Sequence, residues 1–312
     1  MAQKVILLSD SGIDGAFALG LALADPQLEV LGVLASAGTV EADQATRNVF
    51  TLVELFDPPR RPRVGAALPL EYDGHLKALH GNDGLGDSGL PRVSLHSPQP
   101  ADRLLCELVR QHAEDVALVI LGPATVVARA IDRDPELPRL LERIVFVGGT
   151  WREPGDIAAL AEFHFWCDPA AARQVLFCGT PLTLIPLDVS NRLIYAPADL
   201  LTLPEDSTPT GSLLRMLLPL ALAPTAGLRG TEGVHLNDAV GVVAVSRPEL
   251  FTLRAVPVEV EQRGEWTRGT CVIDTRWACP QRPNVDLVID MDLTAVRDHV
   301  QRVLRAAPPA GQ

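Results

Sequence analysis

Cysteine is scarce in this sequence and follows no ligand pattern. The five cysteines of the 312-residue chain are odd in number, widely spaced and free of any C-x-x-C pair. They are Cys106, Cys167, Cys178, Cys271 and Cys279. This pattern favours neither a disulfide framework nor a zinc site.

An excess of positive charge and long apolar runs are also missing. The formal net charge is -12, so no basic stripe is available to neutralise the phosphates of a nucleic acid. We find no apolar run of the ~20 residues that cross a bilayer. Residues 1–4 lead directly into an expected strand, without the layout of a signal peptide. We therefore expect a cytoplasmic protein without a nucleic-acid or membrane partner.

What the chain does have is hydrophobic residues in the rhythm of an α/β fold. They make up 47% of the sequence, which is enough for a sizeable core. The expected strands are residues 5–8, 29–35, 117–121, 144–147 and 182–187. The expected helices are 15–24, 42–56, 101–112, 124–131 and one from Asp168-Pro169 to 175. This alternation predicts a mostly parallel, Rossmann-like central sheet with helices on both faces.

The last third of the chain continues this organisation. Residues 197–227 are rich in leucine and proline and mainly helical in pattern, so we expect a lid or a flank. Residues 256–273 alternate like a β-hairpin, and 285–289 with 293–304 predict a final strand and helix. No repeat and no long linker divides the sequence. We expect a single domain over residues 1–312.

Two carboxylates stand where the first strand should turn into the first helix. Asp10 follows the run 5–8, and Asp14 lies four residues later, with Gly12 expected to relax the turn between them. Chemistry in α/β proteins is found at this edge, so the pair suggests a metal, a sugar hydroxyl or an activated water. The simpler alternative is that Asp10 is an N-cap and Asp14 a first-turn acid favoured by the helix dipole.

Four further segments, in order along the chain, resemble the motifs of the nucleoside hydrolases, which are calcium-dependent enzymes that cleave ribonucleosides to base and ribose. Residues 80–86 read H-G-N-D-G-L-G, and residues 121–125 read L-G-P-A-T. Gly148-Gly149 precedes A-E-F-H-F-W-C-D-P-A-A at 161–171, and N-D-A-V at 237–240 precedes R-P-E-L-F at 247–251. Five such segments between residues 5 and 251 imply the fold of this family.

The resemblance also implies roles for particular residues. Asp10 would ligate calcium and take a proton from the attacking water, and Asp238 and the Leu121 carbonyl would complete the protein's ligands. Asp14 would hold a ribose hydroxyl. The remaining substrate-binding candidates are His80, Asp156, Glu162 and His164. His80 is evenly balanced between packing its loop and contacting the base, and Glu162 has a helix cap as its simpler alternative.

This sequence departs from the family at several of these positions. Leu8, Ser11 and Gly15 replace the first Asp, the Pro and the last Asp of the D-x-D-P-G-x-D-D motif, and that last Asp is a calcium ligand. Counting back from P-E-L-F aligns Asn237 with a histidine that assists the departing base in some members, whereas a rival alignment would use His235. Asparagine cannot act as a general acid at neutral pH.

Three more substitutions change the rest of the pocket. His164 and Thr39 replace asparagines, and Asp156 falls near the position of another. A protonated His164 could partly replace the charge of a lost cation, which is a hypothesis that rests on the acid missing at Gly15.

Two functions follow from these observations. The first is hydrolysis of a ribonucleoside, or a related ribosylated compound, with a modified calcium site. The alternative is a binding or regulatory protein on the same fold that has lost the metal and therefore catalysis. A metal-free enzyme for another glycoside ranks last, because no nearby lysine offers a substitute charge. The resemblance further implies a nucleoside-like ligand and a homo-oligomer, either a dimer or a tetramer.

Overall fold

A computed structural model describes residues 2–72, 76–91, 93, 98–205, 208–276 and 280–306. Cys279 lies outside these ranges. Within them, an eight-stranded sheet has the order β3-β2-β1-β4-β5-β6-β12-β9. Its strands are β1 (Gln3–Ser9), β2 (Leu28–Ala35), β3 (Arg63–Gly65), β4 (Ala117–Leu121), β5 (Arg143–Val147), β6 (Leu182–Ile185), β9 (Phe251–Val256) and β12 (Val285–Met291). Neighbours pair in parallel except β9, which runs antiparallel to β12. The expected fold class is confirmed.

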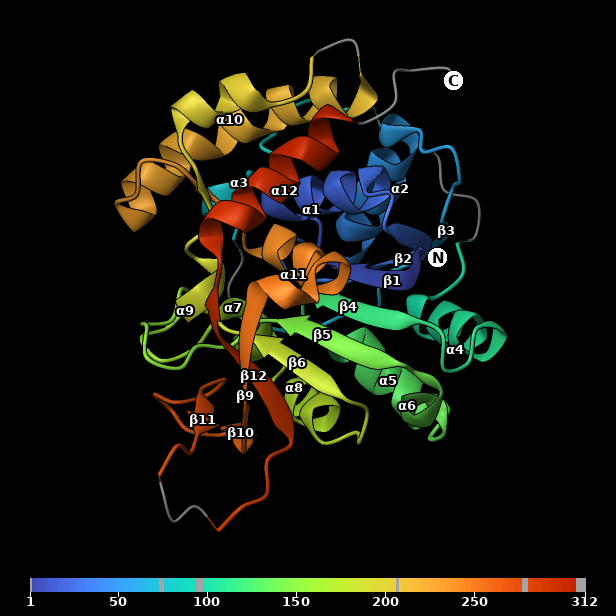
Figure 1. The fold of residues 1–312 in the computed structure, drawn as a ribbon, viewed down its shortest axis with the longest axis vertical. Coiled ribbons are helices and arrows are strands. Elements are labelled where there is room, and N and C mark those ends of the chain that lie inside the picture. Colours follow the sequence, from blue (N-terminus) through green and yellow to red (C-terminus); the bar gives the residue numbers. More distant parts are fainter. Residues whose placement is uncertain are drawn as a thin grey trace.

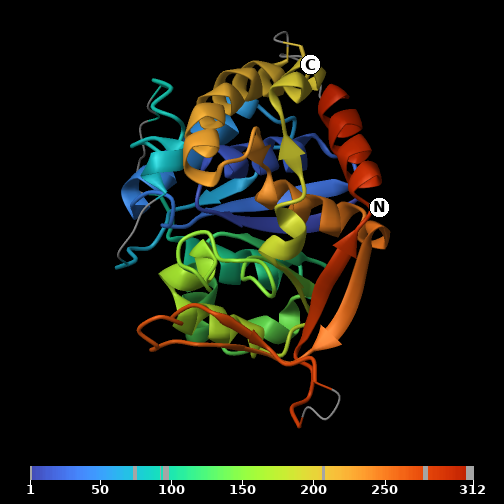
Figure 2. The ribbon, with the colours of Figure 1, turned by 90° about the vertical axis from the view of Figure 1, so that its left-hand side faces the viewer.

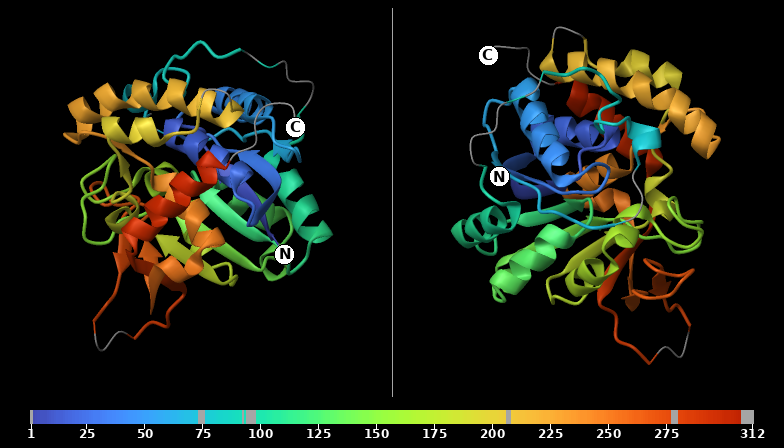
Figure 3. Two further views of the ribbon diagram at one scale, coloured as in Figure 1. Left: turned by 45° about the horizontal axis from the view of Figure 1, so that its top comes forward. Right: turned by 180° about the vertical axis from the view of Figure 1, so that it is seen from behind.

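Helices cover both faces of this sheet. Successive strand residues point to opposite sides, so both faces carry apolar side chains that helices bury. In β1, Val5 and Leu7 enter one hydrophobic core, whereas Ile6 and Leu8 enter the other. The first face carries α1 (Ile13–Ala24), α2 (Ala42–Phe56), α11 (Asn237–Ser246) and α12 (Leu293–Arg305). The second carries α4 (Ala101–Gln111), α5 (Thr125–Arg133), α6 (Leu137–Leu140) and α8 (Pro169–Leu176). Figures 1 and 3 show these layers.

One long helix lies outside the first layer. α10 (Pro209–Arg229) packs on α1 and α2 and reaches α3 (Lys77–His80), as the top of Figure 1 shows. By length and composition alone, α10 could cross a membrane, so the expectation that no such run exists is wrong. Its buried leucines, among them Leu214, Leu217 and Leu218, belong to the first core. A core helix passes the same test, so this finding is weak support for a membrane partner.

Short elements complete the described chain. They are α7 (Phe163–Cys167), α9 (Leu187–Ser190), the 3-10 helices η1 (Pro197–Thr202) and η2 (Pro248–Leu250), and two antiparallel pairs. One pair is β7 (Ile194–Tyr195) with β8 (Val234–His235). The other is the expected hairpin of β10 (Val258–Val260) and β11 (Cys271–Ile273), which lies at the end of the molecule away from α10 (Figure 2).

Some element boundaries differ from the expectations. The first helix begins at Ile13 rather than at residue 15, because Gly12 already occupies the N-cap position. The strand expected over 182–187 ends at Ile185, since Leu187 opens α9. β9 and α11 were not predicted: most of β9 is an exposed edge without alternation, and α11 is apolar on nearly all sides.

Candidate functional site

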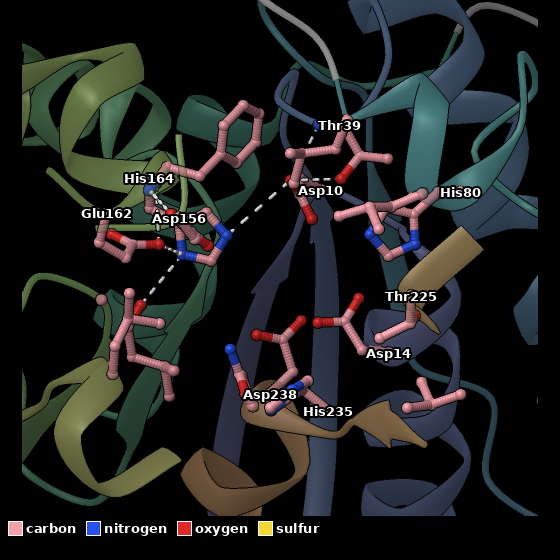
Figure 4. A pocket seen from close by; sticks show the side chains of 18 of the residues that line it. Asp10, Asp14, Thr39, His80, Asp156, Glu162, His164, Thr225, His235 and Asp238 are labelled. Carbon is pink, nitrogen blue, oxygen red and sulfur yellow. Dashed lines mark hydrogen bonds and ion pairs between the residues drawn. The ribbon is translucent and has the colours of Figure 1, made fainter. Parts of the chain in front are cut away.

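Polar side chains converge at the carboxyl ends of the parallel strands. Asp10 follows β1, Thr39 follows β2 and Gly148 follows β5, and all three line one pocket. The pocket brings together the predicted catalytic and substrate-binding residues, which are Asp10, Asp14, His80, Asp156, Glu162, His164 and Asn237, along with Asp238 (Figure 4). The Leu121 backbone carbonyl, predicted as a metal ligand, accepts a hydrogen bond from the Asp10 N–H at 3.3 Å.

The turn after β1 is built differently from the expectation. Ser11, not Gly12, takes the left-handed conformation, with φ 58°, while Gly12 has φ -73°. The Ser11 N–H donates to Ser9 Oγ at 3.2 Å. A Cβ at position 12 would lie 2.9 Å from Asp14 Oδ1 and 3.1 Å from the His80 ring, so a larger residue there would have to displace these two side chains. Gly12 is also the N-cap of α1, so the N-cap alternative for Asp10 is wrong.

Asp10 is fixed in the floor of the pocket, which we define as the side formed by Asp10, Asp14, Glu162, His164 and Asp238. Its side chain is buried, and Oδ2 accepts hydrogen bonds from both the backbone N–H and the hydroxyl of Thr39, each at 2.9 Å. Burial raises the pKa of Asp10, and His164 opposes that rise. A buried, oriented carboxyl group with a raised pKa is suited to accept a proton from water.

Glu162 and His164 form the part of the floor beside the carboxyl end of β5. Glu162 caps α7, since its oxygens accept from the N–H groups of His164 and Phe165 at 2.9 and 3.2 Å. The same carboxylate lies 3.3 Å from His164 Nδ1 and lines the pocket, so the helix-cap interpretation of Glu162 is confirmed and its substrate-binding role stays a prediction. Burial raises its pKa.

His164 is surrounded by acceptors. Nδ1 lies 3.0 Å from the carbonyl oxygen of Val147, which can only accept, and Nε2 lies 3.9 Å from Asp10 Oδ2. Burial lowers the pKa of His164, but Glu162, Asp10 and Asp238 together raise it to about 10. His164 is therefore an imidazolium at neutral pH, held between carboxylates.

Asp14 and Asp238 form the opposite side of the floor. Their carboxyl groups point toward each other in Figure 4. Asp238 is 2% exposed, and its Oδ1 has no hydrogen-bond partner among the described residues. Burial first, and then repulsion from Asp14, raises the pKa of Asp238. An unpartnered buried oxygen facing a pocket is suited to a ligand's hydroxyl group.

Gly15 leaves this side of the floor without a further carboxylate. A Cβ at this position would lie 3.3 Å from Asp238 Oδ2 and 2.9 Å from Ser9 Oγ. An acidic side chain here would therefore stand beside Asp238. Across the residues that the structure describes, no three His, Cys, Asp or Glu side chains are grouped closely enough to hold a metal ion.

The other side of the pocket, which we call the lid, is formed by α3, β8 and the last turns of α10. It carries two neutral imidazoles. His80, at the end of α3, accepts a hydrogen bond at Nδ1 from the Ile13 N–H at 3.1 Å, which places its ring proton on Nε2. Burial lowers the pKa of His80. His235 on β8 contacts the Asn191 carbonyl through Nδ1 at 3.0 Å, and burial lowers its pKa as well.

Asn237 and His235 both line the pocket, so the sequence alternatives are both near the site. Asn237 opens α11 and its amide donates to Asn191 Oδ1 at 3.3 Å. Neither residue supplies a proton readily, because the amide does not titrate and the imidazole is neutral.

Sequence reasoning expected a lid or a flank over residues 197–227 but named none of the α10 residues that line the pocket. Ala221, Thr225 and Arg229 line the pocket, and Arg229 Nη2 pairs with Asp156 Oδ2 at 3.3 Å. One signal was available: Thr225 and Arg229, four residues apart, are the only polar side chains between Pro219 and Arg229. The pocket is partly open to solvent.

The comparisons with known proteins agree with this geometry. The sequence model of the inosine-uridine preferring nucleoside hydrolases matches residues 5–298. The pyrimidine-specific ribonucleoside hydrolase RihA of Klebsiella pneumoniae subsp. pneumoniae is 35% identical over 303 residues, which cover 96% of this chain and 97% of that protein. RihA of Salmonella enteritidis PT4 is 33% identical over 297 residues, 94% of this chain and 95% of its own.

Solved structures show the same fold. A plant nucleoside hydrolase, PpNRh1, superposes with a TM-score of 0.89 at 26% identity, covering 98% of this chain and 100% of that one. A purine-preferring ribonucleoside hydrolase from Gardnerella vaginalis gives the same score at 24% identity, over 98% and 99% of the two chains. The chain belongs to the inosine-uridine preferring nucleoside hydrolase family, whose reaction is hydrolysis of an N-glycosidic bond.

Proposed function

We propose that the protein hydrolyses pyrimidine ribonucleosides to free base and ribose. The observation that carries this proposal is the pocket floor, where Asp10, Asp14, Glu162 and Asp238 converge at the ends of the parallel strands. The pyrimidine preference is supported by relatives that are 33 to 35% identical and carry that specificity in their names.

Asp10 serves as the general base in this proposal. As the bond between the sugar carbon and the base nitrogen breaks, its electron pair passes to the base, and positive charge builds on the sugar ring. A water oxygen then bonds to the sugar carbon, and Asp10 takes the water's proton. The hydrogen bonds from Thr39 hold the carboxylate in one orientation for this transfer.

The other floor carboxylates bind the sugar and stabilise its charge. Asp14 and Asp238, which point toward each other, would accept hydrogen bonds from the ribose hydroxyls. Glu162, already fixed by backbone N–H groups, adds negative charge at the side of the floor. Negative charge placed before the reaction stabilises an oxocarbenium-like transition state.

Calcium, expected at Asp10, Asp238 and Leu121, does not fit these residues well. Two carboxylates and one carbonyl leave most of the roughly 6 to 8 oxygens that calcium takes to water and substrate, and Gly15 supplies no acid. His164 moreover directs a ring nitrogen at Asp10. The proposed reaction therefore has no step that involves calcium, and His164 carries the positive charge of the floor.

A ribose-release assay tests the activity. Uridine, cytidine and inosine are incubated with the protein in calcium and, separately, in chelator, with Asp10→Ala as the inactive control. We expect turnover of the pyrimidine nucleosides that continues in chelator and is lost in Asp10→Ala. Binding of a nucleoside without turnover by the wild-type protein would instead support the alternative, a binding protein on this fold.

Calorimetry of the chelator-treated protein with calcium tests the metal separately. Asp10→Ala and Asp238→Ala are the matched controls. We expect no heat of stoichiometric binding from any of the three proteins. Micromolar or tighter binding that disappears in both variants would restore the predicted calcium site.

The proposal also includes a homo-oligomer, a dimer or a tetramer, that works in the cytoplasm. The oligomer rests on the resemblance to the family. Light scattering of the purified protein measures the oligomeric state, and fractionation of the producing cells measures the location.

A further inference from the structure

Arg229 brings a permanent positive charge to the lid of the pocket. The last turns of α10 contribute Ala221, Thr225 and Arg229, which are four residues apart and therefore share one helix face. A guanidinium group stays protonated in proteins, so its charge does not depend on pH. The floor below is dominated by carboxylates, so the pocket is negative at the sugar end and positive at the lid.

The ion pair with Asp156 holds Arg229 through a single contact. Nη2 donates to Asp156 Oδ2 at 3.3 Å, which is longer than a typical charge-assisted hydrogen bond of about 2.8 Å. The other Asp156 oxygen is fixed by the Phe163 N–H at 2.9 Å. Among the described residues, no other acceptor bonds the guanidinium, whose remaining N–H groups are available to a ligand in the pocket.

The other polar groups of the lid are poor proton donors. His80 and His235 are neutral, because burial and the charge of Arg229 both lower their pKa values. Asn237 stands where a general acid would be useful and has no titratable proton. The departing base therefore needs a partner that stabilises charge instead of donating a proton.

We infer that Arg229 binds the base and stabilises the negative charge that it gains as the N-glycosidic bond breaks; this inference rests on the proposed function. The bond's electron pair passes to the base nitrogen, and the guanidinium donates hydrogen bonds to the resulting anion. Asp10 takes the proton of the attacking water, and the released anion takes a proton from solvent.

This role selects a class of substrate. A base with a carbonyl oxygen beside its glycosidic nitrogen, such as uracil, presents an acceptor on which the negative charge is shared. Bases that form stable anions should react faster than bases that must be protonated to leave. Uracil and cytosine both carry this oxygen, but uracil is the more acidic base and forms the more stable anion, so uridine should be a better substrate than cytidine.

A series of leaving groups tests the inference. The value of kcat/KM is measured for wild type, Arg229→Gln and Arg229→Lys with uridine, with 5-fluorouridine, whose base is more acidic, and with 4-nitrophenyl riboside, which releases a stable phenolate. For Arg229→Gln we expect a loss of about 10²- to 10³-fold on uridine, the cost of removing one charge-stabilising donor. The loss should shrink for 5-fluorouridine and shrink further for the nitrophenyl riboside. Arg229→Lys, which keeps the charge, should lie between the two proteins on uridine.

Asp156→Asn is the matched control, because it breaks the ion pair and leaves the guanidinium in place. We expect it to change kcat/KM by a similar factor on all three substrates. An equal loss on all three substrates in Arg229→Gln would show that Arg229 only holds the lid, and it would overturn the inference while leaving the proposed function intact. A wild-type protein that turns over none of the three would overturn the proposed function itself, and this inference with it.

Discussion

The floor and the lid of the pocket differ in charge and in how firmly they are held. The floor combines four carboxylates with one imidazolium, and backbone N–H groups and a neighbouring hydroxyl fix two of the carboxylates, Asp10 and Glu162. The lid combines two neutral imidazoles with Arg229, which is tied to Asp156 by one hydrogen bond of 3.3 Å. Asp10 and Glu162 are therefore oriented before substrate binds, whereas Arg229 is the group that can respond to it.

The lid helix has built-in weak points. Pro219 and Pro224 lie inside α10, and each removes a backbone hydrogen bond from the helix. Under the proposed function, the floor stabilises the charge of the sugar, and the weakly held Arg229 end of α10 admits and releases the base.

The largest effect should come from the floor. Asp10→Asn keeps the shape of the side chain and removes its ability to take a proton, so kcat should fall by about 10³-fold, within the usual range for a general base. Asp43→Asn, at an exposed position on α2, is the matched control and should behave like wild type. Nearly full activity in Asp10→Asn would show that Asp10 is not the general base.

A gain of calcium binding is the next test of the floor. Gly15→Asp places a third carboxylate beside Asp238, at the cost of a small shift of Ser9, whose hydroxyl lies 2.9 Å from the new Cβ. More ligand charge tightens calcium binding, so we expect its affinity for the variant to rise by about a hundredfold. Calorimetry compares Gly15→Asp with Gly15→Asn, which has the same size and no charge. Equal affinities of the two variants for calcium would show that the missing acid at position 15 does not explain why calcium fits this site poorly.

The sequence predicts the floor better than the lid, for a physical reason. Asp10 and Asp14 lie within one strand-helix turn, and Glu162 and His164 within one helix start, so local structure alone brings each pair together. Arg229 and Asp156 are separated by 73 residues, and only the packing of α10 brings them together. Local pattern carries no information on such a contact.

A second limit of the sequence lies in the first turn. Gly12 was expected to adopt the unusual backbone conformation, which the structure gives to Ser11. Asp14 and His80 come close to position 12, and the sequence does not reveal that approach. The fold class, by contrast, follows from periodicity, which needs no knowledge of tertiary contacts.

His164 should have a smaller effect, and one that depends on pH. Its pKa is raised to about 10, so the positive charge is present at neutral pH and is lost as pH rises through about 10. Because the imidazolium favours the ionised form of Asp10, kcat/KM of His164→Ala should be about tenfold lower than that of wild type on the acidic side and should approach it as pH rises through about 10. Without the imidazolium, the pKa of Asp10 should rise, so the acidic limb of the variant's profile should move to higher pH. Equal activity and identical profiles in the two proteins would show that His164 contributes no charge to the floor.

The smallest effect concerns the turn that carries the floor. Ser11 has φ 58° and a buried hydroxyl without a partner among the described residues. A left-handed conformation costs a residue with a Cβ about 1 kcal/mol, a cost that glycine avoids. Ser11→Gly should therefore increase the free energy of unfolding by about 1 kcal/mol, measured by urea denaturation, less the entropy that glycine adds to the unfolded chain. Ser11→Ala, which removes the hydroxyl and keeps the strain, is the control and should gain less. If the glycine variant gains stability and loses activity, the strain at Ser11 is what orients Asp10, and the rigidity of the floor is then maintained at the expense of stability.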